Sequence, residues 1–170
     1  MPAPELDAAG IARIFNEHGV EYVVIGAYAA IAQKAPIPAT RDIDFTPEAS
    51  IDNLNRLSRA LKALGARIRT DAVDGDLPFS HDGASLGRSE MWNLVCDLGE
   101  FDLAFHPAAF QSGYLGLVDR AHKVLVDGVL VTVADLDDVI LSKETAGRPK
   151  DLRVLPILYR FSALKKAGDA

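Results

Sequence analysis

Apolar and polar positions in the first half of the chain alternate between strand-like and helical spacing. Residues 22–25 are continuously apolar, which is typical of a strand buried on both faces. A short helix that stops near Gly19 is predicted before this strand, and an alanine-rich helix over 27–33 is predicted after it. A second strand is expected at 41–45.

The next segments have clearer boundaries. Ser50 is suited to cap an amphipathic helix in which leucines recur every three or four residues, and Gly65 is suited to end it. Residues 70–89 contain four aspartates, three glycines and a proline without periodicity, so a long loop is predicted there. Met91 and Trp92, at the start of the next apolar run, are expected in the core.

Two hairpins and two helices are predicted in the second half. The first hairpin joins 91–97 to 101–105 through Leu98-Gly99-Glu100, and the second joins 123–126 to 129–133 through the turn dipeptide Asp127-Gly128. The helices are expected at 136–146, with Asp135 as N-cap, and at 151–166, with an early interruption at Pro156.

This order of elements predicts an α/β (α+β) fold with a mixed β-sheet flanked by helices. We expect one domain over residues 1–170, with a C-terminal helical part from about residue 135.

Composition narrows the class of protein. The chain has 170 residues, of which 49% are apolar and 25% charged, as in globular proteins with a sizeable core. There is neither a membrane-spanning apolar run nor an N-terminal signal pattern, so a cytoplasmic protein without membrane attachment is expected. The single cysteine, Cys96, excludes an intramolecular disulfide and is expected to be buried.

The net charge of −6 argues against extensive coating of nucleic acid. The final thirty residues are nevertheless richer in Lys and Arg than the rest, which leaves room for a local basic groove.

Two aspartates in the second predicted strand are the strongest chemical signal. Asp42 and Asp44 would project from the same face, because residues i and i+2 of a strand do so. Adjacent carboxylates repel one another unless a cation lies between them, and Mg²⁺ prefers oxygen ligands of this kind. The alternative interpretation is an exposed strand end.

A third carboxylate is expected from Asp102, which stands alone among apolar neighbours at 101–105. Burial of such a group is costly without a hydrogen bond or a metal ion. If its strand lies beside that of Asp42 and Asp44, the three carboxylates converge. The alternative is an exposed residue on an edge strand.

These residues carry a resemblance. Gly26-Ala27, then Thr40-Arg41-Asp42-Ile43-Asp44, then Asp102, resembles the nucleotidyltransferase fold shared with DNA polymerase β. Within that fold, Lys143 followed by Arg148-Pro149-Lys150-Asp151-Leu152 is similar to the C-terminal signature of the AbiEii/MenT group of toxins from toxin–antitoxin systems.

The resemblance implies transfer of a nucleoside monophosphate from a nucleoside triphosphate (NTP) to an acceptor hydroxyl, with release of pyrophosphate. Mg²⁺ (or Mn²⁺) would be held by Asp42, Asp44 and Asp102, and Asp102 would help to deprotonate the acceptor. Lys143 would serve catalysis and bind the triphosphate. The resemblance implies further nucleotide-binding residues, namely Gly26, Ala27, Arg148, Lys150 and Asp151. Many members of the superfamily have Gly or Ser where this chain has Ala27, so a weaker grip on phosphate is expected.

For the toxin-like group, the implied acceptor is the 3′ end of tRNA, to which a pyrimidine nucleotide is added so that aminoacylation is blocked. The tRNA would be held by C-terminal cations, namely Lys150, Arg153, Arg160, Lys165 and Lys166. A cognate antitoxin is the implied protein partner, and phosphorylation of Thr40 by it would silence the site. Two alternatives remain, which are adenylylation of proteins or small molecules, and a non-enzymatic nucleotide-binding module.

Overall fold

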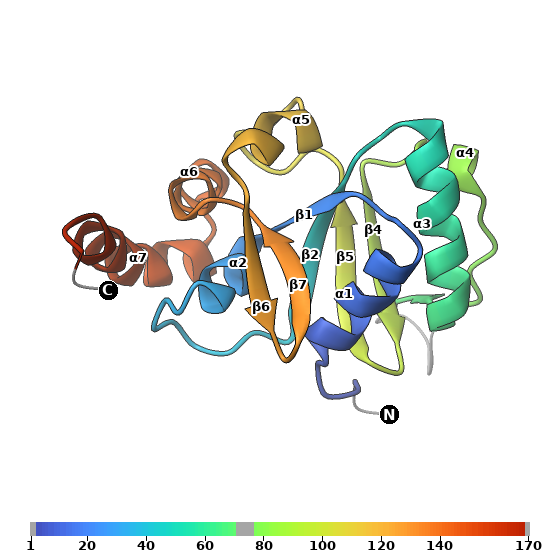
Figure 1. The fold of residues 1–170 in the computed structure, drawn as a ribbon, viewed down its shortest axis with the longest axis horizontal. Coiled ribbons are helices and arrows are strands. Elements are labelled where there is room, and N and C mark those ends of the chain that lie inside the picture. Colours follow the sequence, from blue (N-terminus) through green and yellow to red (C-terminus); the bar gives the residue numbers. More distant parts are fainter. Residues whose placement is uncertain (1–2, 71–76, 169–170) are drawn as a thin grey trace.

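The computed structural model describes residues 3–70 and 77–168 (Figure 1). Within these residues, seven strands form one mixed sheet in the order β3-β4-β5-β2-β1-β7-β6. The strands are β1 (Tyr22–Ile25), β2 (Asp42–Pro47), β3 (Arg67–Ile68), β4 (Met91–Cys96), β5 (Gly99–Ala104), β6 (His122–Val126) and β7 (Val129–Val133). The β2–β5 and β1–β7 pairs are parallel and the other pairs are antiparallel.

Helices flank this sheet, which confirms the predicted α/β class. They are α1 (Ala8–Glu17), α2 (Gly26–Ala32), α3 (Ile51–Leu64), α4 (Gly83–Leu86), α5 (Tyr114–Leu117), α6 (Leu136–Ala146) and α7 (Pro149–Lys166), with a 3₁₀ helix η1 (Val118–Arg120). The predicted caps are confirmed, since the Ser50 hydroxyl accepts from Asn53 N–H and Asp135 accepts from Asp137 N–H. Gly65 ends α3 in the left-handed conformation.

A cluster of aromatic side chains packs against one face of the sheet. Phe15 of α1 contacts Phe45 of β2, with ring centroids 4.5 Å apart, and also packs near Tyr22 and Phe101. Because side chains alternate along β2, burial of Ile43 and Phe45 on this face directs Asp42 and Asp44 to the other. The core therefore determines which face carries the acidic residues.

Several predicted boundaries are wrong. The loop expected at 70–89 contains α4 and an isolated bridge at Leu77, while 71–76 lie outside the described residues. Strand β3 precedes that loop and was not predicted. The first hairpin turns at Asp97-Leu98, one residue earlier than predicted, because Gly99 is already paired with Cys96.

The last helix also differs from the prediction. It begins at Pro149, whose missing N–H costs nothing in a first turn, and it continues through Pro156 without interruption. Proline deprives only the Leu152 carbonyl of its helical partner, and Leu152 is exposed to water. Buried Leu155 and Leu158 hold the helix on both sides of the proline.

Cys96 is buried, as predicted, but Met91 is 56% exposed and does not belong to the core. Trp92 is half-buried and donates its indole N–H to the Leu86 carbonyl. Over residues 3–70 and 77–168, every helix is too short or too polar to cross a lipid bilayer.

Candidate active site

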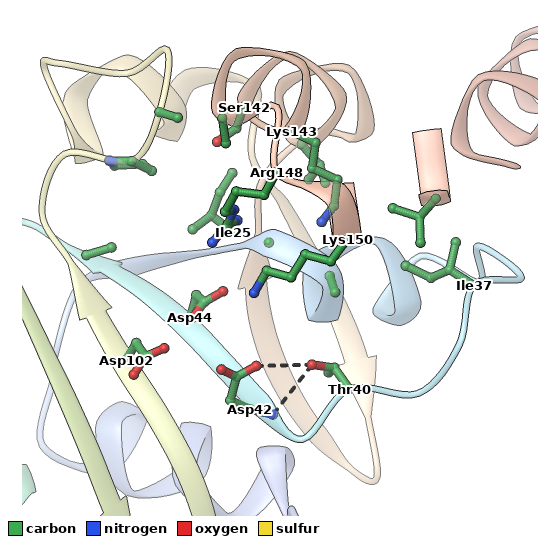
Figure 2. Close-up of a pocket in the computed structure, with 18 of the residues that line it drawn as sticks. Ile25, Ile37, Thr40, Asp42, Asp44, Asp102, Ser142, Lys143, Arg148 and Lys150 are labelled. Atoms are coloured by element: carbon green, nitrogen blue, oxygen red, sulfur yellow. Dashed lines mark hydrogen bonds between the residues drawn. The ribbon is translucent and has the colours of Figure 1, made fainter. Parts of the chain in front are cut away.

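The three predicted carboxylates meet where β2 and β5 lie side by side. These strands are parallel and in a register that places Asp44 opposite Asp102, so the predicted adjacency is confirmed. One carboxylate oxygen from each of Asp42, Asp44 and Asp102 lies within 4.8 Å of the others. Figure 2 shows the three side chains projecting into one pocket. Neither alternative interpretation holds, because β2 and β5 are interior strands of the sheet and none of the three aspartates is exposed.

Gly26 lines the same pocket, directly beside Asp44. It follows Ile25, which pairs with Asp44 across β1 and β2, and it has a φ of +77°. A Cβ atom at this position would overlap the Asp44 carboxylate. Glycine is therefore required both by its backbone conformation and by the close approach of the carboxylate. Helix α2 begins at Gly26, one residue earlier than predicted.

The three carboxylates repel one another when they are ionised. Burial, followed by the negative charges of Asp42 and Asp102, raises the pKa of Asp44 from 3.8 to about 8. Burial also raises the pKa of Asp102, although Arg69 opposes this shift. Three convergent carboxylates with only oxygen donors fit a hard divalent cation, which would relieve the repulsion that raises these pKa values.

This repulsion predicts how the stability of the metal-free protein depends on pH. A carboxyl whose pKa is raised in the folded state adds stability below its unfolded pKa, and that stability is lost as pH rises towards 8. Asp44→Asn removes the charge, so we expect it to raise the Tm at pH 8 by several degrees. About 2 kcal/mol corresponds to roughly 4–8 °C in a chain of this size.

Thermal unfolding in EDTA at pH 4 and pH 8 tests this expectation, with Asp52→Asn on the exposed start of α3 as the matched control. The gain from Asp44→Asn should shrink at pH 4, where Asp44 is protonated in the folded wild type. An equal gain at both pH values would contradict the electrostatic explanation.

The carboxylates lie in a pocket of about 590 Å³. Three cations from the α6–α7 region line it, namely Lys143, Arg148 and Lys150. In Figure 2 the Lys150 ammonium points towards Asp42 and Asp44, and its charge lowers the pKa of Asp44. The pocket thus has three carboxylates on one side and, on the other, a basic wall formed by the three cations. This arrangement suits a phosphate ester that binds together with a metal ion.

Asp151 holds two residues of the basic wall in place through hydrogen bonds. It is fully buried and accepts hydrogen bonds from Arg148 Nε at 2.7 Å and from Lys143 Nζ at 3.4 Å. It also accepts from the Arg148 backbone N–H at 3.2 Å, which caps α7. Burial raises the pKa of Asp151, but the cations Arg148 and Lys143 outweigh burial and hold it below its usual value. Asp151 therefore both caps the start of α7 and orients two of the cations that line the pocket.

Thr40 and Ala27 also line the pocket. The Thr40 hydroxyl donates to Asp42 Oδ1 at 3.1 Å (Figure 2). A phosphate at this position would place negative charge directly beside the carboxylate cluster.

The predicted C-terminal cations differ in their surroundings. Lys150 faces the pocket, whereas Lys165 donates to Gln33 and Lys166 pairs with Asp137 at 3.0 Å. Arg153 and Arg160 are exposed on α7.

Sequence reasoning missed three residues near the carboxylates. Arg69 forms an ion pair with Asp102, and Asn93 lies directly opposite Asp102 on β4 and lines the pocket together with exposed Met91. The polar Asn93 within an apolar strand was a usable signal. Arg69 had none, because β3 is only two residues long.

Comparison with known proteins identifies the fold. No family model and no curated protein matches the sequence. Among solved structures, a lincosamide antibiotic adenylyltransferase with bound lincomycin superposes with a TM-score of 0.60 at 13% identity, over 92% of this chain and 98% of that one. The enzyme ANT(2'')-Ia in complex with adenylyl-2''-tobramycin gives 0.58 at 14% identity, over 92% and 87%.

A provisionally assigned nucleotidyltransferase from Thermotoga maritima gives a TM-score of 0.55 at 15% identity, over 86% of each chain. These similarities extend over most of each chain, although few residues are identical. The protein has the nucleotidyltransferase fold.

Proposed function

We propose that this protein is a metal-dependent nucleotidyltransferase, which transfers a nucleoside monophosphate from an NTP to an acceptor hydroxyl and releases pyrophosphate. The observation that carries the proposal is the convergence of three carboxylates from β2 and β5 opposite a wall of cations in one pocket. Burial of three mutually repelling carboxylates costs stability, which favours a site that binds a divalent cation over a purely structural cluster.

Each residue has a task in this reaction. Asp42, Asp44 and Asp102 would hold Mg²⁺ or Mn²⁺, which when bound lowers the pKa of the attacking hydroxyl and offsets charge on the phosphates. Asp102 would accept the proton of the acceptor hydroxyl. The oxygen of that hydroxyl would form the new bond to the α-phosphorus, while the bond to the pyrophosphate oxygen breaks.

The cationic wall would bind the triphosphate. Lys150 projects towards the carboxylates, where a point charge suits a flexible phosphate chain. Lys143 and Arg148 would add charge at positions that Asp151 holds in place. Gly26 and Ala27, at the start of α2, line the same pocket, and their backbone N–H groups would be further donors to phosphate.

For the acceptor, we propose the 3′ end of tRNA, and a role as the toxin of a toxin–antitoxin pair. The support is the resemblance of Lys143 and residues 148–152 to the toxin-like group, together with exposed Arg153 and Arg160 on α7, which could contact phosphates. A pyrimidine nucleotide is the proposed substrate, a cognate antitoxin is the proposed partner, and Thr40 is the proposed site of silencing phosphorylation.

A second candidate is adenylylation of a small molecule. Two of the solved structures that share this fold are antibiotic adenylyltransferases, and each covers nine-tenths of this chain. Lys165 and Lys166 are already paired within the protein, which weakens the case for a tRNA-binding surface at the end of α7.

Labelling distinguishes these acceptors. Purified protein is incubated with Mg²⁺ and each α-³²P-labelled NTP in turn, with total tRNA, with a panel of hydroxylated small molecules including aminoglycosides and lincosamides, or with no added acceptor. We expect label on tRNA from one or two pyrimidine nucleotides, and no label with Asp42→Ala.

Label on a small molecule from ATP would favour the second candidate, and label on the protein itself would favour protein adenylylation. No label on any acceptor, with Mg²⁺–NTP binding absent as well, would contradict nucleotidyl transfer.

A further inference from the structure

Arg69 occupies an unusual position next to the candidate metal site. It lies one residue past β3 at the edge of the sheet, where its backbone N–H donates to the Asn93 carbonyl at 3.0 Å. Its guanidinium passes over β4 and reaches β5, where it lies 3.0 Å from Asp102 Oδ1 and 3.4 Å from Glu100 Oε2. A residue distant in sequence thus holds the third carboxylate of the cluster.

The geometry suits arginine in particular. Glu100 and Asp102 are two residues apart on β5, so both project from the same face, and a planar fork with five donors can bind both at once. The three side chains are only 13–24% exposed, so their ion pairs are weakly screened by solvent. Arg69 also donates to the Leu94 carbonyl, which fixes the guanidinium further.

The arrangement has two electrostatic consequences. The pair with Arg69 occupies Asp102 Oδ1 and restrains the orientation of the carboxylate. It also places a positive charge beside the cluster of Asp42, Asp44 and Asp102. That charge reduces the attraction of the cluster for a metal cation.

We propose that Arg69 is a positioning residue for this site, which orients Asp102 for the reaction and at the same time limits how tightly divalent ions bind before the nucleotide arrives. This inference rests on the proposed function for its effect on turnover, whereas its effect on ion binding can be measured without any reaction.

The two effects of removing Arg69 have opposite signs. Arg69→Gln leaves the carboxylates with one more uncompensated charge, so divalent ions should bind more tightly. Asp102 also loses its fixed orientation, so turnover should slow. A merely structural role would weaken ion binding and turnover together. The Tm should fall in either case, because Glu100 and Asp102 lose their cation, so it serves only to show that the variant is folded at the assay temperature.

The test compares Arg69→Gln and Arg69→Lys with Arg67→Gln, a matched control two residues earlier that pairs with the highly exposed Asp97. The Kd for Mn²⁺ is measured without nucleotide from the electron paramagnetic resonance signal of free Mn²⁺, and kcat, KM for the NTP, and Tm are measured in parallel.

For Arg69→Gln we expect the Kd for Mn²⁺ to fall by about 3–10-fold. We expect kcat to fall by about 10–100-fold with little change in KM, as for other residues that orient a metal ligand. Arg69→Lys should keep the Kd near that of the wild type but still lose turnover, because lysine has the charge without the fork. Arg67→Gln should change neither value.

A Kd that does not fall in Arg69→Gln, or a kcat that does not fall, would overturn the inference. If the wild type binds Mn²⁺ but transfers no nucleotide, the proposed function fails, and the Kd values alone decide whether Arg69 restrains ion binding. If the wild type binds no Mn²⁺, the metal site and this inference fail together.

Discussion

Asp44→Asn is expected to lower nucleotidyl transfer by at least about a thousandfold. Asparagine keeps the shape of the side chain but removes the charge from the middle of the carboxylate cluster, where Asp44 lies opposite Asp102. Bound metal ions contribute several kcal/mol of transition-state stabilisation, and each 1.36 kcal/mol corresponds to a factor of ten in rate.

The measurement is single-turnover release of labelled pyrophosphate at saturating NTP and Mn²⁺, so that weaker ion binding is not mistaken for slower chemistry. Asp52→Asn, an identical change on the exposed start of α3, should retain the wild-type rate. Because the metal-free Asp44→Asn protein should be at least as stable as the wild type at pH 8, its loss of rate cannot be attributed to unfolding. A rate above one-tenth of the wild type would exclude Asp44 as a metal ligand.

Asp151→Ala is expected to reduce the free energy of unfolding by about 3–5 kcal/mol at pH 7. Asp151 is fully buried and neutralises Lys143, whose side chain is only 10% exposed. Removal of one partner from a buried ion pair leaves the other charge without compensation, which is the costly case. The helix α7 also loses its N-terminal cap at Arg148.

Chemical denaturation of the wild type and the variant measures this loss. Asp97→Ala removes an exposed pair with Arg67 and should cost about 1 kcal/mol or less. Adding Lys143→Met to Asp151→Ala should restore part of the lost stability, because it removes the orphaned ammonium. Since the pKa of Asp151 is lowered in the folded state from its ordinary value of 3.8, its contribution is complete at pH 7 and is lost only as pH falls below that ordinary value and through the lower folded pKa. A loss below 1 kcal/mol for Asp151→Ala would mean that water or another group compensates Lys143.

Local patterns predicted the elements that depend on nearby residues. The caps at Ser50 and Asp135, the left-handed Gly65 and the turn at Asp127-Gly128 were predicted because each involves residues within four positions of one another. Pro156 misled the prediction for the opposite reason. Its local effect is to break a helix, whereas the burial of Leu155 and Leu158 against the rest of the protein keeps α7 intact.

The sequence by itself determined that Asp42 and Asp44 share one face of a strand, because alternation is a property of the extended backbone. It also determined the α/β class, through the period of the apolar positions. Only the tertiary structure decided that β5 lies parallel to β2 with Asp102 opposite Asp44, that Arg69 reaches Asp102 across β4, and that Asp151 lies buried between Lys143 and Arg148. These contacts join residues whose approach depends on strand order and helix packing, and those are set by the hydrophobic core as a whole rather than by spacing along the chain.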